Sequence, residues 1–169
     1  SHILKNLEKL VGFKLNINYF TYYKTKHVPE YLSHNQYFAN LWHTDRLFTS
    51  NTMKLFVAVE DIGINNGPLM WINKRDTKKY ITKEFIAEKD EEINIHKFIG
   101  AKGDCIIINS NQCKHKAGNP SEGYSRLMLM FQLNPSKISS YQADLYDKQF
   151  ILEPNLPFLR NTFRKKILI

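Results

Sequence analysis

The stretch Trp42-His43-Thr44-Asp45 places an imidazole and a carboxylate two residues apart. In an extended segment, side chains at positions i and i+2 point to the same side, so His43 and Asp45 can converge on one point. A third donor must come from elsewhere, and His115, which follows the apolar run Cys105-Ile106-Ile107-Ile108, is the best-placed candidate. Two imidazoles and one carboxylate on one side of a metal, with open positions opposite, favour non-haem Fe(II).

Arg126 follows His115 by eleven residues and begins the apolar run Leu127-Met128-Leu129-Met130-Phe131. By strand alternation, Arg126 shares a face with Met128 and Met130. An arginine on an inward face must be paired, because an isolated buried charge is prohibitively costly. A guanidinium suits bidentate binding of a carboxylate, so we predict an anion-binding role for Arg126. An outward-facing arginine on a sandwich strand is the alternative.

Short β-forming runs separated by Gly, Asn and Pro turns dominate the chain. Strands are predicted over 13–24, 41–45, 53–61, 68–73, 104–109 and 124–133, after an amphipathic helix over 3–11. In the first strand, Leu15, Ile17 and Tyr19 are expected to share one face, opposite Phe20 and Tyr22. The charged segment 74–99 is expected to be an insertion with a helical turn over 84–92. This pattern predicts a mainly β sandwich or barrel, with the jelly roll as the member built around a ligand-binding mouth.

Composition indicates a globular chain, since 43% of its 169 residues are hydrophobic and 13% are aromatic. No apolar run approaches the roughly 18 residues of a membrane helix, so no membrane partner is expected. Twenty-four basic and 16 acidic residues give a net charge of +8. That charge fits either a lysine-rich composition without functional meaning or a basic surface for an anionic substrate. Nucleic acid is not an expected partner. Arg160 to Lys166 is the one basic cluster with an interleaved aromatic residue.

Two cysteines, Cys105 and Cys113, form neither a C-x-x-C spacing nor a disulfide framework. This usage predicts a reducing, cytoplasmic location. Cys113 lies two residues before His115 and is therefore an alternative metal ligand, although a thiolate would favour zinc or copper over iron.

Five segments together resemble the phytanoyl-CoA dioxygenase type of Fe(II)/2-oxoglutarate-dependent oxygenases. They are His43-x-Asp45, Asn65-Asn66-Gly67-Pro68-Leu69, Gly103-Asp104, His115-Lys116-Ala117-Gly118 and Arg126, and they span roughly residues 40–135. The resemblance implies a double-stranded β-helix (jelly roll, cupin-like) with short flanking helices. It also implies a single oxygenase domain over 1–169, with 136–169 packing on it as a tail. The part before residue 13 is short for that family, so an N-terminal truncation is one expectation. One departure is Asn73-Lys74-Arg75-Asp76, which stands where similar proteins often carry a Pro-Gly-Ser-His turn.

The family implies a role for each residue of the site. His43, Asp45 and His115 would be the catalytic iron ligands, and Arg126 would hold the distal carboxylate of 2-oxoglutarate. Phe56 falls where an aromatic often lines the cosubstrate pocket. Many relatives add a hydroxyl beside the arginine, and position 128 is Met here. The candidates for that second contact are Tyr19, Tyr22, Lys54 and Thr44.

The implied reaction is hydroxylation of a small-molecule C–H bond, using molecular oxygen and converting 2-oxoglutarate to succinate. Related halogenases lack the carboxylate, so Asp45 argues for a hydroxylase. Two alternatives stay open: a cupin-like isomerase or hydrolase that uses the same metal but no 2-oxoglutarate, and a catalytically degenerate binding module. His27, His34 and His96 are expected at the surface, and Trp42 and Trp71 in the core or the substrate pocket. The sequence identifies neither the substrate nor the oligomeric state.

Overall fold

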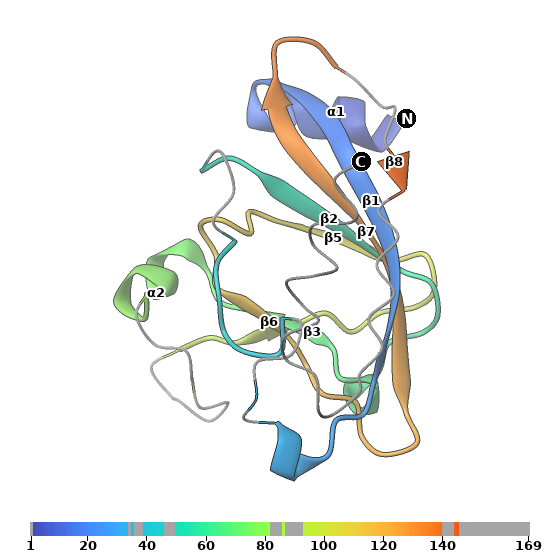
Figure 1. Cartoon of the computed structure of the whole chain (residues 1–169). Coiled ribbons are helices and arrows are strands. Elements are labelled where there is room, and N and C mark those ends of the chain that lie inside the picture. The colour runs from blue at the N-terminus through green and yellow to red at the C-terminus, as the bar shows by residue number, and fades with distance from the viewer. Residues whose placement is uncertain are drawn as a thin grey trace.

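A computed structural model of the chain describes residues 2–33, 35, 39–45, 50–81, 86, 93–139 and 144–145 (Figure 1). Its elements are α1 (His2–Val11), β1 (Lys14–Lys26), η1 (Glu30–Leu32), β2 (Met53–Ala58), η2 (Ile64–Asn66), β3 (Leu69–Trp71), α2 (Lys74–Lys79), β4 (His96–Lys97), β5 (Cys105–Ile108), β6 (His115–Ala117), β7 (Ser125–Ser136) and β8 (Asp144–Leu145). None of the described helices is long and apolar enough to cross a membrane.

The strands form two sheets that face each other. The larger has the order β5-β2-β7-β1-β8 and the smaller the order β4-β3-β6. All pairings are antiparallel except the parallel contact between β1 and β8. Figure 1 shows the long β1–β7 pair running the length of the molecule, with α1 across one end. The predicted mainly β, two-sheet jelly roll is therefore confirmed.

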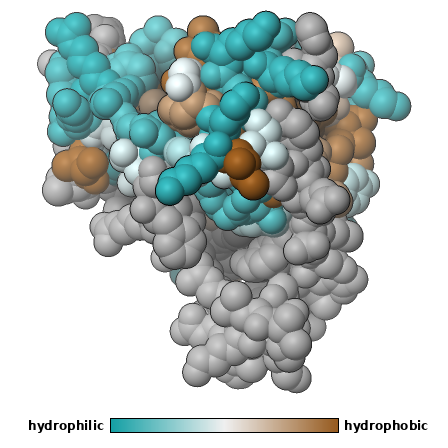
Figure 2. Space-filling model, turned by 90° about the horizontal axis from the view of Figure 1, so that it is seen from above, coloured by the Kyte–Doolittle hydropathy of each residue, from teal (hydrophilic) through white to brown (hydrophobic). Residues whose placement is uncertain are grey.

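The large sheet buries apolar side chains on both faces. Its inner face packs Phe56, Met128 and Met130 against Leu69 and Phe98 from the small-sheet side. Its outer face carries a second cluster with the apolar side of α1, made of Leu4, Leu7, Leu15, Ile17, Met53, Leu55 and Leu133. Figure 2 views the molecule from the α1 end, where most described residues are hydrophilic and hydrophobic ones form small, separate groups. The amphipathic helix predicted over 3–11 thus closes the outer face of the sheet.

A β-bulge in β1 decides which side chains enter the interior. Ile17 pairs with Leu133 and Tyr19 with Gln132, so Asn18 is an extra residue in this strand. Two residues facing one partner reverse the alternation beyond the bulge. Tyr19 therefore joins the inner cluster, while Ile17 stays with the outer one. The expectation that Tyr19 shares a face with Ile17 was wrong for this reason.

Two glycines fix the register of the small sheet. Gly67 has a φ of 64°, and a Cβ there would collide with the backbone of Pro120. At Gly118, a Cβ would lie 2.5 Å from the Pro68 carbonyl oxygen, which accepts a hydrogen bond from the Gly118 N–H. Only glycine allows the two backbones to approach this closely. The same pairing places His115 opposite Trp71, three residues further along each strand.

Several local expectations differ from the structure. The strand expected over 41–45 is reduced to an isolated bridge at His43. The last long strand does not end at 133 but continues to Ser136, past the point where β2 stops pairing at Leu133. β7 then has a partner on one side only, where a proline such as Pro135 is tolerated.

The insertion over 74–99 contains α2, which Asn73 caps by accepting a hydrogen bond from the Asp76 N–H at 2.8 Å. The helical turn predicted over 84–92 lies outside the described residues, except Ile86. Most of the predicted tail over 136–169 also lies outside them. Within the described part, Ser139 Oγ donates to Glu8 Oε1 of α1 at 2.7 Å.

Candidate metal centre

His43 and His115 are held together by their backbones. The His43 N–H donates to the His115 carbonyl at 3.1 Å, and the His115 N–H donates to the His43 carbonyl at 2.9 Å. His115 lies at the start of β6, so this bridge adds His43 to the edge of the small sheet. The two imidazole rings lie with centroids 4.4 Å apart. Residues 72 positions apart in the chain are thereby neighbours.

Asp45 completes a group of three metal-binding side chains. Each offers one ligand atom, and the three atoms lie within 4.8 Å of one another. Asp45 Oδ1 is 3.9 Å from His43 Nε2, and Asp45 Oδ2 is 3.8 Å from His115 Nε2. The backbone N–H of Asp45 donates to the Ser110 carbonyl at 2.9 Å, which ties the carboxylate to the end of β5. The structure thus brings together the three residues singled out from the sequence.

Hydrogen bonds orient both imidazoles. Nδ1 of His43 lies 2.8 Å from the Leu41 carbonyl oxygen, and Nδ1 of His115 lies 3.1 Å from the Cys113 carbonyl oxygen. A carbonyl accepts only, so each Nδ1 is assigned as the protonated donor. The Nε2 atom of each ring is then the one turned toward Asp45. A metal-binding histidine is commonly held in this way, with its second nitrogen donating to a backbone carbonyl.

The charges of the centre suit a cation. Burial, aided by the positive potential of His43, lowers the pKa of His115 to about 3, so this imidazole is neutral at ordinary pH. Burial raises the pKa of Asp45, but the Lys54 ammonium and neighbouring groups outweigh it and bring this pKa below its usual value. The centre therefore presents the neutral imidazole of His115 and an ionised carboxylate, which are ligand forms that a metal requires.

Lys54 lies in the centre itself. Its Nζ forms an ion pair with Asp45 Oδ2 at 2.5 Å, and both side chains are only 14% exposed. On β2, Lys54 pairs with Gln132 of β7 on one side and Ile108 of β5 on the other. The sequence had offered Lys54 as a cosubstrate contact, and the structure gives it a carboxylate partner among the candidate ligands.

Arg126 points into the interior, as the parity of β7 predicted. It is 1% exposed, and its Nη2 donates to Thr25 Oγ1 at 3.2 Å. Its Nε and Nη1 are buried without a hydrogen-bond partner. Burial lowers the pKa of Arg126, but a guanidinium titrates so high that it stays charged. The outward-facing alternative is therefore wrong, and two buried donors are left for a ligand to accept from.

The hydroxyls beside Arg126 differ from those expected. Thr25 is the cross-strand partner of Arg126, and Tyr23 is the partner of Met128. Tyr23 Oη lies 3.9 Å from Met128 Sδ, and burial raises the pKa of Tyr23. Tyr22 is 53% exposed on the other side of β1. The bulge at Asn18 explains this exchange, because beyond it the odd-numbered residues of β1 face inward.

Tyr19 and Phe56 lie on the inner face, but further along it. Tyr19 pairs with Gln132, six residues from Arg126 on β7. Phe56 pairs with Met130 and belongs to the inner cluster. Thr44 lies between two candidate ligands in the chain and is partly exposed.

The remaining candidates lie outside the group of three. Among the described residues, the metal-binding group includes neither His27, His96 nor Cys113. Burial raises the pKa of the Cys113 thiol, which disfavours the thiolate that a metal would need. His96 stacks on Trp71 with ring centroids 5.2 Å apart, and Trp71 is the cross-strand neighbour of His115. Trp42 is buried in the core, and His34 lies outside the described residues.

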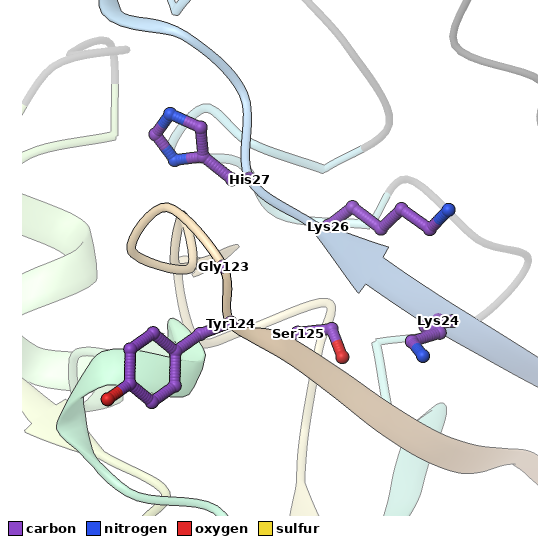
Figure 3. A pocket seen from close by; sticks show the side chains of 6 residues that line it. All are labelled: Lys24, Lys26, His27, Gly123, Tyr124 and Ser125. Carbon is purple, nitrogen blue, oxygen red and sulfur yellow. The ribbon is translucent and has the colours of Figure 1, made fainter.

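A separate cavity of about 390 Å³ lies where β1 ends and β7 begins, lined by Lys24, Lys26, His27, Gly123, Tyr124 and Ser125. Figure 3 shows the side chains of Lys26 and His27 pointing in different directions. His27 Nδ1 lies 2.8 Å from the Pro120 carbonyl oxygen. The cavity shares no lining residue with the group of three and brings no set of donors to one point.

Comparison with family models gives no match, and neither does comparison with curated proteins. Solved structures do match. The non-heme alpha ketoglutarate dependent epimerase SnoN from nogalamycin biosynthesis has a TM-score of 0.57 and 17% identity, over 79% of this chain and 54% of SnoN. SnoN in complex with Fe3+, alpha ketoglutarate and nogalamycin RO has a TM-score of 0.52 and 13% identity, over 79% of this chain and 55% of SnoN.

The nickel complex of the non-heme monooxygenase ThoJ has a TM-score of 0.54 and 15% identity, over 98% of this chain and 70% of ThoJ. The chain thus spans about half the length of SnoN and 70% of the length of ThoJ. None of these three structures is described as a phytanoyl-CoA dioxygenase, so membership of that family stays a prediction. At these identities the likeness establishes architecture, and this chain has the cupin-like jelly-roll fold of non-haem metal enzymes such as SnoN and ThoJ.

Proposed function

We propose that the protein is an Fe(II)- and 2-oxoglutarate-dependent dioxygenase that hydroxylates a C–H bond of a small molecule. The observation that carries the proposal is the pairing of two features inside one jelly roll. His43, Asp45 and His115 form a group that suits a metal, and Arg126 is a buried cation with two unpaired donors. A metal site alone does not require such an arginine, whereas a dicarboxylate cosubstrate does.

The ligand set favours iron over the common alternatives. Two imidazoles and one carboxylate with open positions opposite are typical of non-haem Fe(II) oxygenases, while sulfur-rich sets favour zinc or copper. His43, Asp45 and His115 would hold the iron. When bound, iron with 2-oxoglutarate and oxygen supplies the oxidising chemistry, and succinate and carbon dioxide are the co-products.

The protein's own contribution is binding and orientation. Arg126 would pair with the distal carboxylate of 2-oxoglutarate, and its Nε and Nη1 would gain acceptors there. Tyr23 and Thr25 supply hydroxyls close to the same guanidinium. Phe56, Met128 and Met130 form an apolar inner surface that keeps water from the reacting atoms.

The structural neighbours support this class of chemistry. SnoN is described as an alpha ketoglutarate dependent epimerase and ThoJ as a monooxygenase, so proteins of this fold catalyse both epimerisation and oxygenation. We infer a small-molecule substrate, in line with the nogalamycin compound bound to SnoN. The cytoplasmic location stays a prediction from the cysteine usage.

Turnover of 2-oxoglutarate tests the proposal. Purified protein with Fe(II) and oxygen should release succinate, and candidate small molecules should be screened for stimulation of that release. His115→Ala should remove the activity. Metal-dependent conversion of a substrate without succinate would favour the cupin-like isomerase or hydrolase. Metal and 2-oxoglutarate binding without turnover of any substrate would favour the degenerate binding module.

A further inference from the structure

The ion pair between Lys54 and Asp45 is the shortest polar contact described above for the metal centre. Lys54 Nζ lies 2.5 Å from Oδ2 of the carboxylate, which is also 3.8 Å from His115 Nε2, and Oδ1 lies 3.9 Å from His43 Nε2. Lys54 and Asp45 come from different parts of the fold, because Lys54 is the second residue of β2 and is paired there with both β7 and β5. The contact therefore depends on the tertiary fold.

The ion pair makes the two oxygens of Asp45 unequal. Oδ2 is occupied by an ammonium that is largely shielded from water. The Coulomb attraction between two charges in direct contact is larger where little solvent screens them. Both oxygens face the imidazoles, Oδ1 toward His43 and Oδ2 toward His115, but only Oδ2 also contacts the ammonium, which leaves Oδ1 as the oxygen without a competing cation. Without Lys54, both oxygens could turn to the metal together.

We propose that Lys54 is a positioning residue that restricts Asp45 to binding the metal through one oxygen. The inference rests on the proposed function and deepens it, because it states how the centre keeps its open positions. An octahedral metal with three single-atom protein ligands has about three positions left. The proposed cosubstrate, a chelating keto acid, together with oxygen would need all of these positions to be free. A carboxylate bound through both oxygens would occupy one of these positions.

The state of the metal can be measured without turnover. Mn2+ is a redox-stable substitute whose bound, exchanging waters enhance the relaxation of solvent protons. The variants are Lys54→Met, which removes the ammonium, and Lys54→Arg, which keeps a cation. Lys5→Met, at an exposed position of α1, removes the same charge far from the centre. All are prepared with Mn2+ present, since bound metal offsets the charge of Asp45.

In Lys54→Met, we expect the relaxation enhancement per bound Mn2+ to fall by about one third, from three waters to two. The affinity for Mn2+ should be unchanged or higher, because the carboxylate contributes a second oxygen and a repelling charge is gone. The affinity for 2-oxoglutarate should fall by about tenfold or more, as is common for residues that orient a ligand. Lys54→Arg and Lys5→Met should match the wild type.

Other results would overturn the inference. Equal relaxation in Lys54→Met and wild type, with weaker 2-oxoglutarate binding, would mean that Lys54 touches the cosubstrate instead. A Lys54→Met protein that stays unfolded with Mn2+, while Lys54→Arg folds, would assign Lys54 to stability. Failure of the wild type to bind Mn2+ at all would remove the proposed function together with this inference, so the two failures are distinguishable.

Discussion

His43 and His115 exchange both backbone hydrogen bonds, at N–O distances of 3.1 and 2.9 Å, and their imidazole rings lie 4.4 Å apart. The spacing of these two candidate ligands is therefore set by the pairing of their backbones. The pairing itself depends on the small sheet, in which β6 lies beside β3. A rigid pair of this kind pre-organises a metal site, because little conformational entropy remains to be lost on binding.

Removal of one imidazole should abolish tight metal binding. For His115→Ala we expect the affinity for Ni2+ or Co2+ to fall by more than about 100-fold, since loss of a direct ligand exceeds the effect of an outer partner. Isothermal titration of the metal-free protein measures the change. The control is His27→Ala, because His27 lies outside the metal-binding group. Equal losses in the two variants would contradict the assignment.

The metal-free protein should lose stability in mild acid. The pKa of His115 is about 3 in the folded state and about 6.5 when unfolded, so between these values only the unfolded chain takes up the proton. Stability therefore rises with pH through this window and levels off above it. Between about pH 5 and pH 7, the contribution is of the order of 2 kcal/mol.

Urea unfolding at both pH values, with chelator present, measures this dependence, and His115→Gln should flatten it. An unchanged pH dependence in His115→Gln would mean that the ring of His115 is not held neutral by burial.

Replacement of the buried arginine should separate stability from cosubstrate binding. Arg126→Met removes a buried charge with two unpaired donors, so the ligand-free protein should gain about 1–3 kcal/mol. The same variant should lose the stabilisation that 2-oxoglutarate gives to the metal-loaded wild type. Thermal unfolding with and without 2-oxoglutarate, in the presence of Ni2+, reads out both effects. Stabilisation by 2-oxoglutarate that persists in Arg126→Met would assign the carboxylate to another residue.

The close approach of Gly118 to Pro68 should matter for the metal centre. In Gly118→Ala the new Cβ would press on the Pro68 carbonyl, which should shift β6 against β3 and displace His115. Overpacking of this kind costs about 1–3 kcal/mol, and we expect metal affinity to fall with it. Gly103→Ala is the matched control. Gly103 has a φ of 92° and no neighbour near a new Cβ, so that variant should lose stability but keep its metal affinity.

The sequence predicted those features that depend on local spacing. The i, i+2 relation of His43 and Asp45 and the parity of Arg126 on β7 follow from strand geometry, and the structure agrees with both. The choice of His115 as the third member also proved to be spatially correct. Their roles as ligands stay predictions for the experiments above.

The parts that the sequence did not predict depend on long-range pairing. The bulge at Asn18 arises from the register of β1 against β7, and it exchanges Tyr22 for Tyr23 beside Arg126. The ion pair of Lys54 with Asp45 requires β2 to lie next to the segment that carries His43 and Asp45. No local pattern encodes either relation, because each joins residues through contacts between separate elements.

Anaerobic titration of the protein with Fe(II) and 2-oxoglutarate tests the central claim most directly, because it needs no substrate. Chelation of Fe(II) by the keto acid produces a visible charge-transfer absorption. The account predicts that this band appears only when both are present, saturates at one iron per chain, and is lost in His115→Ala. A wild-type protein that binds Fe(II) at another site, or that shows no band with 2-oxoglutarate, would contradict it.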